Sequence, residues 1–137
     1  KMPIAAILSR YAFCVHGGVT HPEPTSCINK KNAFQYMWND PTEHETGLRP
    51  SQRGSTVRDF GPDVVREFLH MNNLDVIIRG HTALMPGYAW LFDRQLLSLF
   101  SCPNYCGAGN RAAYAILDNG AINVFDYKNT GRVKKSS

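Results

Sequence analysis

Two histidines stand in the same local setting, at the end of an apolar segment and next to glycine. His16 follows the apolar run that ends at Val15 and precedes two glycines, and His81 follows Gly80 after the apolar run 74–79. Glycine beside a strand end lets the backbone bend sharply and approach a ligand closely. An imidazole placed there can ligate a transition metal or act as an acid or base, although a single histidine is more often structural. The repeated setting favours one shared site for the two histidines.

Three further side chains have the chemistry to contact phosphate. Arg53 lies in a polar, glycine-containing segment, where its planar guanidinium can face phosphate oxygens or simply remain solvated. Arg79 lies between an apolar run and His81, so its burial requires an acidic or phosphate partner. Tyr105 either packs on the core or offers its hydroxyl to an oxyanion. Local sequence leaves these alternatives open.

The composition predicts one globular domain. The chain has 137 residues, of which 43% are hydrophobic and 19% charged. No apolar run approaches the roughly 20 residues of a membrane helix, so we expect no membrane span. The formal charge of +4 comes from a basic segment at 128–137, predicted to be a flexible tail, and the remainder is neutral. With no stacking aromatics among the basic residues, we expect no nucleic-acid partner.

Four cysteines bear on the compartment. They are Cys14, Cys27, Cys102 and Cys106. Their spacing fits neither a Cys-x-x-Cys metal pair nor the dense disulfide framework of a small secreted protein. We therefore expect free thiols in a reducing compartment, the cytoplasm, the nucleus or both.

Hydrophobic patterning predicts an α+β domain with mostly strands and few helices. Helices are predicted at 28–38, ended by Asp40-Pro41, and at 61–72, where Pro62 and Asp63 suit a first turn. Strands are predicted at 4–8, 11–15, 74–79, 88–92, 95–100, 112–117 and 121–127, with a hairpin turn at Asp118-Asn119-Gly120. The polar segment 41–59 is expected to be a long ordered loop or a substrate-facing segment.

Five different short motifs follow one another along the chain. They are Val15-His16-Gly17-Gly18, Trp38-Asn39-Asp40-Pro41, Arg53-Gly54, Arg79-Gly80-His81 and Ser101-Cys102-Pro103-Asn104-Tyr105-Cys106-Gly107. Together they resemble the second half of the catalytic domain of the PPP family of Ser/Thr protein phosphatases, from about Pro3 to about Tyr127. The resemblance implies that residues 1–127 form the C-terminal portion of that domain, part of a four-layer αββα metallophosphatase sandwich.

The resemblance also implies roles for individual residues. His16 and His81 would be ligands of one of two metal ions (manganese, iron or zinc), Arg53 and Tyr105 would contact phosphate at the catalytic centre, and Arg79 would stand beside it as a further phosphate-binding residue. The implied reaction is metal-dependent hydrolysis of phosphoserine and phosphothreonine in phosphoproteins, with regulatory protein subunits as further partners. We expect the two imidazoles to face one cleft, with Arg53 and Tyr105 on its rim.

The sequence departs from the family in one respect that bears on activity. The first-half signatures Gly-Asp-x-His-Gly, Gly-Asp-x-x-Asp-Arg-Gly and Gly-Asn-His-Glu, which supply the bridging aspartate and the general-acid histidine in the family, do not occur. Two imidazoles without a bridging carboxylate cannot hold a dinuclear centre, so we expect these 137 residues alone to be inactive. The alternative to a part of a longer phosphatase domain is a phosphatase-like binding or regulatory module without catalysis.

Overall fold

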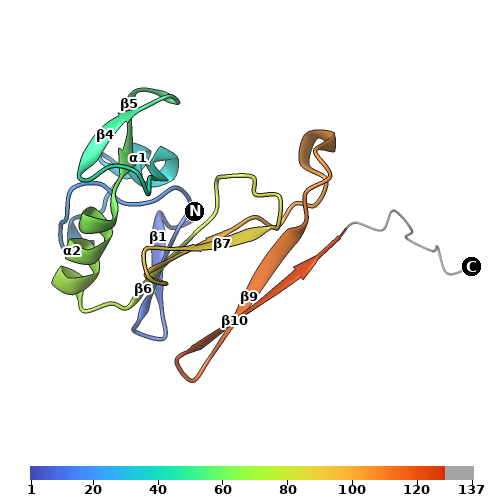
Figure 1. Cartoon of the computed structure of the whole chain (residues 1–137). Helices are drawn as coiled ribbons and strands as arrows, with labels where there is room; N and C mark the ends of the chain where they lie inside the picture. Colours follow the sequence, from blue (N-terminus) through green and yellow to red (C-terminus); the bar gives the residue numbers. More distant parts are fainter. Residues whose placement is uncertain (129–137) are drawn as a thin grey trace, which may run out of the picture.

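A computed structural model describes residues 1–128 as strands and short helices around a five-stranded sheet (Figure 1). The elements are β1 (Ala5–Leu8), β2 (Ala12–Val15), the 3₁₀-helix η1 (Thr25–Cys27), α1 (Ala33–Trp38), β3 (Asp40–Pro41), β4 (Leu48–Ser51), β5 (Gly54–Phe60), α2 (Pro62–Asn72), β6 (Val76–Arg79), β7 (Tyr88–Leu91), β8 (Leu96–Leu99), the 3₁₀-helix η2 (Tyr105–Gly107), β9 (Ala112–Asp118) and β10 (Ala121–Tyr127). The predicted tail 128–137 lies outside the described residues apart from Lys128. Each strand predicted from the sequence is confirmed to within about two residues.

The five-stranded sheet has the strand order β1-β2-β6-β8-β7. Its three inner strands, β2, β6 and β8, run parallel, and the two outer strands are antiparallel to their neighbours. Ser9 and Arg10, in the turn between β1 and β2, have φ values of 50° and 63°, as the two central residues of a type I′ turn require. Because the inner strands are parallel, their carboxyl ends meet at one edge of the sheet, and the residues that follow them are gathered there.

The core lies between this sheet and α2. The predicted helix is confirmed: Pro62 occupies the first turn with Asp63, and Asn73 ends the helix in the left-handed conformation at φ 52°. The buried face of α2 consists of Val64, Val65, Phe68 and Leu69. The Phe68 ring lies 4.9 Å from the ring of Phe13 on β2, measured between centroids. The packing of α2 on the sheet fixes the orientation of β2 and β6, whose ends carry the two histidines.

The prediction of a helix over 28–38 is wrong in its first half, because the helix begins only at Ala33. The preceding residues form a turn in which asparagine side chains bond to the backbone. Asn29 Oδ1 accepts from the Lys31 amide at 2.8 Å, and Asn32 Oδ1 accepts from the Asn29 amide at 2.8 Å. Such local bonds compete with helical ones, which is why asparagine favours turns and caps.

The prediction of a loop over 41–59 is also wrong. Residues 48–60 form β4 and β5, which pair antiparallel around a two-residue turn, and β3 adds a third strand to this small sheet. Most side chains in β4 and β5 are polar and at least partly exposed, so the apolar alternation that signals a strand is missing from the sequence. The turn between the two strands presents Arg53.

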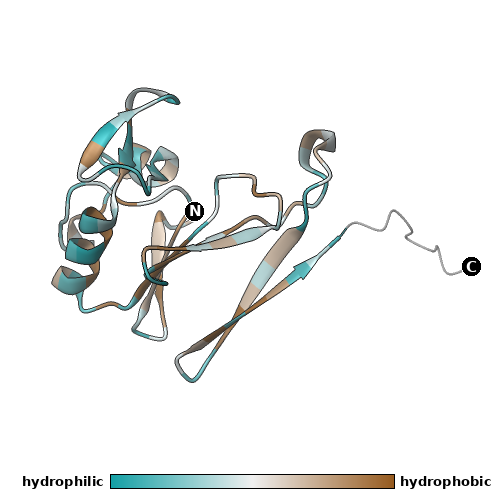
Figure 2. Cartoon of the chain, in the orientation of Figure 1, coloured by the Kyte–Doolittle hydropathy of each residue, from teal (hydrophilic) through white to brown (hydrophobic). Residues whose placement is uncertain are grey.

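β9 and β10 form a separate two-stranded hairpin (Figure 1), and Asn119 and Gly120 have the positive φ values, 47° and 83°, of its predicted turn. Apolar side chains occur on both of its faces, and apolar residues are coloured brown along both strands in Figure 2. One face carries Tyr114, Ile116, Phe125 and Tyr127, each between 39% and 50% exposed, and the other carries Ala115, Leu117, Ile122 and Val124.

No helix in the described residues is long and apolar enough to cross a membrane.

Candidate functional site

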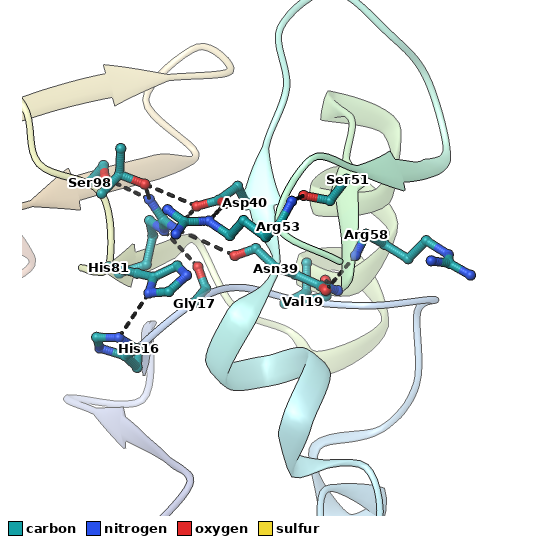
Figure 3. A network of polar contacts seen from close by, with 12 residues as sticks. His16, Gly17, Val19, Asn39, Asp40, Ser51, Arg53, Arg58, His81 and Ser98 are labelled. Atoms are coloured by element: carbon teal, nitrogen blue, oxygen red, sulfur yellow. Dashed lines mark hydrogen bonds and ion pairs between the residues drawn. The ribbon is translucent and has the colours of Figure 1, made fainter. Parts of the chain in front are cut away.

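His16 and His81 lie side by side at the edge where the parallel strands end (Figure 3). His16 follows β2 directly, and His81 follows β6 after Gly80. The Nε2 atom of His16 lies 3.1 Å from the Nδ1 atom of His81, and the two rings meet edge to face with centroids 4.8 Å apart. The two histidines therefore lie close together, as expected, whereas their facing one common cleft stays a prediction.

The backbone around Gly80 brings the two rings together. The Gly80 amide donates to the His16 carbonyl at 3.0 Å, which joins the two strand ends. His81 has a φ of 70°, in the left-handed region that residues other than glycine occupy infrequently. Such strained conformations cluster at ligand-binding and catalytic sites, where the surrounding structure holds them in place.

The 3.1 Å separation of the two nitrogens is that of a hydrogen bond, and it also suits two ligands of one metal ion. Nitrogen ligands about 2.1 Å from a tetrahedral or octahedral ion stand about 3.0 to 3.4 Å apart. The other ring nitrogen of His81, Nε2, is buried and has no hydrogen-bond partner within residues 1–128. Burial and the nearby charge of Arg53 lower the pKa of His81, which favours the neutral form that a metal ligand needs.

The described residues supply only part of a metal site. Within residues 1–128, no group of three or more histidine, cysteine, aspartate or glutamate side chains is arranged to hold an ion. The Trp38 ring packs edge to face on the His81 ring at 89°, with centroids 5.3 Å apart, so an aromatic ring rather than a carboxylate contacts this side of the histidine. The geometry of His16 and His81 thus fits two positions of one ion, and a complete site would need further ligands.

A second polar cluster, which we call the Asp40 network, lies next to the histidines (Figure 3). At its centre the Asp40 carboxylate accepts hydrogen bonds from Arg53, Arg79 and Thr82. Burial by itself would raise the pKa of Asp40, but the hydrogen bond from Arg53 and the charge of Arg79 outweigh it and lower the pKa below its ordinary value. Asp40 is therefore an ionised carboxylate shared by two guanidinium groups.

Arg79 is enclosed by acceptors. Its side chain is 1% exposed, and burial lowers its pKa although the Asp40 carboxylate partly offsets this. A guanidinium carries five N–H donors. Those of Arg79 meet five acceptors: the Gly17 carbonyl at 2.6 Å, Asp40 Oδ1 at 2.6 Å, Thr82 Oγ1 at 2.8 Å, Ser98 Oγ at 3.1 Å and the Asn39 carbonyl at 3.3 Å. A phosphate contact from Arg79 would therefore require one of these bonds to break.

Arg53 is placed differently from Arg79. It lies in the turn between β4 and β5, and its side chain is 35% exposed. Its Nε donates to Asp40, whereas neither of its Nη atoms donates a hydrogen bond within residues 1–128. Arg53 borders a pocket of about 360 Å³ that Asp40, Glu43 and Thr82 also line, and neither histidine lines this pocket. The phosphate-binding role predicted for Arg53 stays a prediction, with free donors available for it.

Tyr105 lies in η2, in the segment that follows β8 at the same sheet edge. Its ring is 48% exposed and packs edge to face on Phe100 with centroids 5.1 Å apart. The side chain of buried Asn110 holds the backbone of this segment, accepting from the Tyr105 amide at 2.7 Å. Within residues 1–128, no hydrogen bond or ring contact joins Tyr105 to Arg53 or to either histidine, so its predicted place on the rim of a common cleft stays a prediction.

The sequence motifs predict no role for Asp40 or for its neighbour Asn39. Asn39 is completely buried; its side-chain Nδ2 donates to the Val19 carbonyl at 3.0 Å, and its Oδ1 accepts from the Arg58 backbone amide at 2.9 Å. One signal for Asp40 was present in the sequence, because a buried arginine at a strand end requires an acidic partner. That signal did not say which acidic residue it was.

The same glycine-to-alanine substitution should have different effects on the free energy of unfolding at two glycines of the site. A Cβ added at Gly17 would lie 2.5 Å from the backbone carbonyl carbon of Met37, whereas at Gly80 its nearest neighbour would be the Leu99 carbonyl oxygen at 3.5 Å. We expect Gly17→Ala to lower the free energy of unfolding by about 1 to 3 kcal/mol. Gly80→Ala should leave it unchanged or raise it by about 0.4 to 1 kcal/mol. Urea denaturation of both variants checks this, and equal losses would contradict the close approach at Gly17.

Comparison with known proteins places this geometry in a family. The family model for calcineurin-like phosphoesterases matches residues 1–85. The serine/threonine-protein phosphatase BSL2 of Arabidopsis thaliana is 36% identical over 125 residues, which covers 81% of this chain and 12% of that protein. A solved protein serine/threonine phosphatase from Saccharomyces cerevisiae, described as similar to human phosphatase PP5, superimposes with a TM-score of 0.78 at 27% identity, over 93% of this chain and 47% of that one.

These matches confirm the predicted fold class, a mixed α/β arrangement of mostly strands with few helices that corresponds to part of the PPP phosphatase fold. The chain spans about half the length of the solved yeast phosphatase and about an eighth of the length of the Arabidopsis protein. Since the family match covers more than half of the chain and the paired histidines fall within it, the chain belongs to the calcineurin-like phosphoesterase family.

Proposed function

We propose that this chain is part of the catalytic domain of a metal-dependent Ser/Thr protein phosphatase, which hydrolyses phosphoserine and phosphothreonine in phosphoproteins. The observation that carries the proposal is the pair of imidazole nitrogens 3.1 Å apart at the sheet edge, next to an arginine whose Nη atoms have no hydrogen-bond partner in the described part of the chain. The identity to a serine/threonine-protein phosphatase of Arabidopsis supports the substrate class.

In this proposal each residue of the site has a different role. His16 and His81 hold one metal ion, and Arg53 offers its Nη donors to the phosphate, where charge-assisted bonds strengthen as negative charge develops. Arg79 fixes the strand ends around the site, and Tyr105 borders the substrate. When bound, metal ions of the manganese, iron or zinc type supply Lewis-acid stabilisation of the phosphoryl oxygens and an activated water.

The apolar faces of the β9–β10 hairpin support the proposal that the complete domain is larger than this chain. Within residues 1–128, β9 and β10 pair only with each other, and apolar side chains cover both faces of the hairpin. A two-stranded hairpin is at best marginally stable alone, and a strand that is apolar on both faces is typical of the interior of a layered domain. We infer that further strands and metal ligands come from another polypeptide segment of the same domain.

The first test is the activity of the 137-residue chain itself. We expect no appreciable hydrolysis of a phosphopeptide or of para-nitrophenyl phosphate with added manganese, because the described residues provide only two imidazoles of the metal site. Metal-dependent turnover that His81→Ala abolishes would show that this chain is catalytically sufficient and would refute the proposed incompleteness.

Metal binding tests the positive half of the proposal. Titration of the same chain with cobalt(II), followed by the signals of the histidine rings, should show weak binding that depends on both His16 and His81. The matched control is His44→Ala, which removes an exposed histidine from the polar segment before β4 and should leave binding unchanged. Binding that persists in His16→Ala or His81→Ala would place the ion elsewhere.

The alternative is a phosphatase-like binding module without catalysis. The observation in its favour is the lack of a three-residue ligand group within residues 1–128. The cobalt titration distinguishes the two functions. Binding that depends on both His16 and His81 supports the phosphatase, whereas a module that has lost the metal site should show no such binding.

We also propose regulatory protein subunits as partners and the cytoplasm or nucleus as the compartment. All four cysteines are free thiols, and three of them are exposed. Exposed free thiols persist in reducing compartments. Treatment of the native chain with a thiol-specific alkylating reagent should modify Cys27, Cys102 and Cys106 without prior reduction.

A further inference from the structure

Asp40 is the point at which two arginines from distant parts of the chain meet. It is the first residue of β3, two residues after the end of α1, and its Oδ1 accepts from Arg79 Nη2 at 2.6 Å and from Thr82 Oγ1 at 2.9 Å. Its Oδ2 accepts from Arg53 Nε. The Asp40 side chain is 18% exposed, so most of its surface faces these partners.

The Oδ1 side of this carboxylate is rigidly anchored. Arg79 is fixed by four acceptors besides Asp40, among them the Gly17 carbonyl next to His16 and the Asn39 carbonyl next to Asp40. Thr82, the residue after His81, accepts from Arg79 and donates to Asp40. Because these partners belong to strand ends and loops around the histidine pair, the position of the Asp40 carboxylate is tied to that of the pair.

The Oδ2 side orients Arg53. The only side-chain hydrogen bond of Arg53 within residues 1–128 goes from Nε to Asp40. A guanidinium held by Nε still presents the two Nη groups at its far end, and this pair of donors matches two oxygens of a phosphate. The carboxylate thus constrains the side chain while leaving its phosphate-binding edge free.

Arg53 carries the accessible positive charge of the cluster, and Glu43 adds a negative charge to the lining of the same pocket. Two guanidinium groups share one carboxylate, so the three side chains together keep a net charge of one positive unit. Arg79 is 1% exposed and fully bonded, which leaves the accessible part of that charge on Arg53. A lone arginine–carboxylate pair would instead be neutral.

We propose that Asp40 is the positioning residue for phosphate recognition: it holds Arg53 through Nε and aims its Nη edge at a phosphate group. This inference rests on the proposed function, because it takes Arg53 as the phosphate contact. Asp40 itself touches no phosphate. It acts through the orientation of Arg53 and through the anchor that Arg79 provides.

The sign of one effect separates positioning from simple charge. Asp40→Asn removes a negative charge close to Arg53, so a purely electrostatic role predicts tighter phosphate binding in the variant. Positioning predicts the opposite, a dissociation constant for inorganic phosphate about tenfold higher, because the charge-assisted bond that orders Arg53 is lost. A phosphate titration of the complete 137-residue chain, followed by the ¹⁵N signals of the arginine Nε–H groups, measures both the affinity and the order of Arg53.

A second variant keeps the test independent of folding. Arg53→Lys preserves the charge and leaves the Asp40–Arg79 pair intact, but it removes the Nε–H and the planar pair of Nη donors. We expect it to weaken phosphate binding by about the same factor of ten. The matched control is Arg49→Lys, on β4, whose exposed side chain pairs with Glu45 and which should bind phosphate as the wild type does.

Each outcome decides a different question. Phosphate binding that is unchanged or tighter in Asp40→Asn, or unchanged in Arg53→Lys, overturns the positioning role. An Arg53 Nε–H signal that is equally mobile in the wild type and in Asp40→Asn overturns it as well. If phosphate shifts no Arg53 signal in the wild type while Asp40→Asn still releases the Nε–H, then Asp40 does order Arg53 but the phosphate contact, and with it that part of the proposed function, is wrong.

Discussion

In the complete catalytic domain, Arg53→Ala should slow phosphate-ester hydrolysis roughly a hundredfold or more. Within residues 1–128, neither Nη group of Arg53 has a hydrogen-bond partner and its Nε is held by Asp40, so the substitution removes a preoriented bidentate contact rather than a solvated charge. Loss of a contact that strengthens in the transition state costs on the order of 2 to 4 kcal/mol. Turnover of a phosphopeptide by the wild type and the variant at saturating manganese measures the effect.

The metal dependence distinguishes this defect from that of His81→Ala. Removal of a ligand weakens occupancy of the metal site, so part of the His81→Ala loss should be recovered at high manganese concentration. The Arg53→Ala loss should not be recovered, because this side chain contacts the phosphate. Arg49→Ala serves as the control for a general loss of positive charge. An Arg53→Ala enzyme with an unaltered rate and phosphate affinity would show that this arginine is only a solvated residue of the turn.

The second large effect concerns stability. Arg79→Met should lower the free energy of unfolding by about 3 to 5 kcal/mol, the range for removing one partner of a buried ion pair. The substitution leaves four other acceptors without their donor, including the Gly17 and Asn39 carbonyls, although Asp40 keeps Arg53. Urea denaturation of the 137-residue chain, with the slope of the transition compared between variants, gives the value.

Arg111→Met is the matched control for Arg79→Met. Arg111 also pairs with an aspartate, Asp126, but their side chains are 34% and 41% exposed. Exposed ion pairs contribute about 0 to 1 kcal/mol, so this variant should unfold nearly as the wild type does. Equal losses in the two variants would mean that the burial of Arg79 is not what makes its hydrogen bonds important.

The sequence was most informative where local pattern and burial agree. α2 was predicted almost residue for residue, because Pro62 and Asp63 mark its start and its apolar residues share one face. The hairpin β9–β10 followed from alternating strands around an Asn-Gly turn. Where local pattern was weak, prediction failed. β4 and β5 are polar strands without visible alternation, and the asparagines before α1 form side-chain bonds that replace a helical turn.

The sequence by itself indicated that His16 and His81 belong together, since both end apolar strands beside glycine. The parallel pairing of those strands, which brings the two ends to one edge, is seen only in the structure. Only the tertiary structure decided which residues support them. Asp40 is 13 residues from Arg53 and 39 from Arg79, and no periodicity links these positions. The alternation of apolar and polar residues along one strand indicates which of its own side chains face the protein core. A buried ion pair depends instead on how separate elements pack, so its partners are fixed only when the sheet, α1 and the β4–β5 turn assemble.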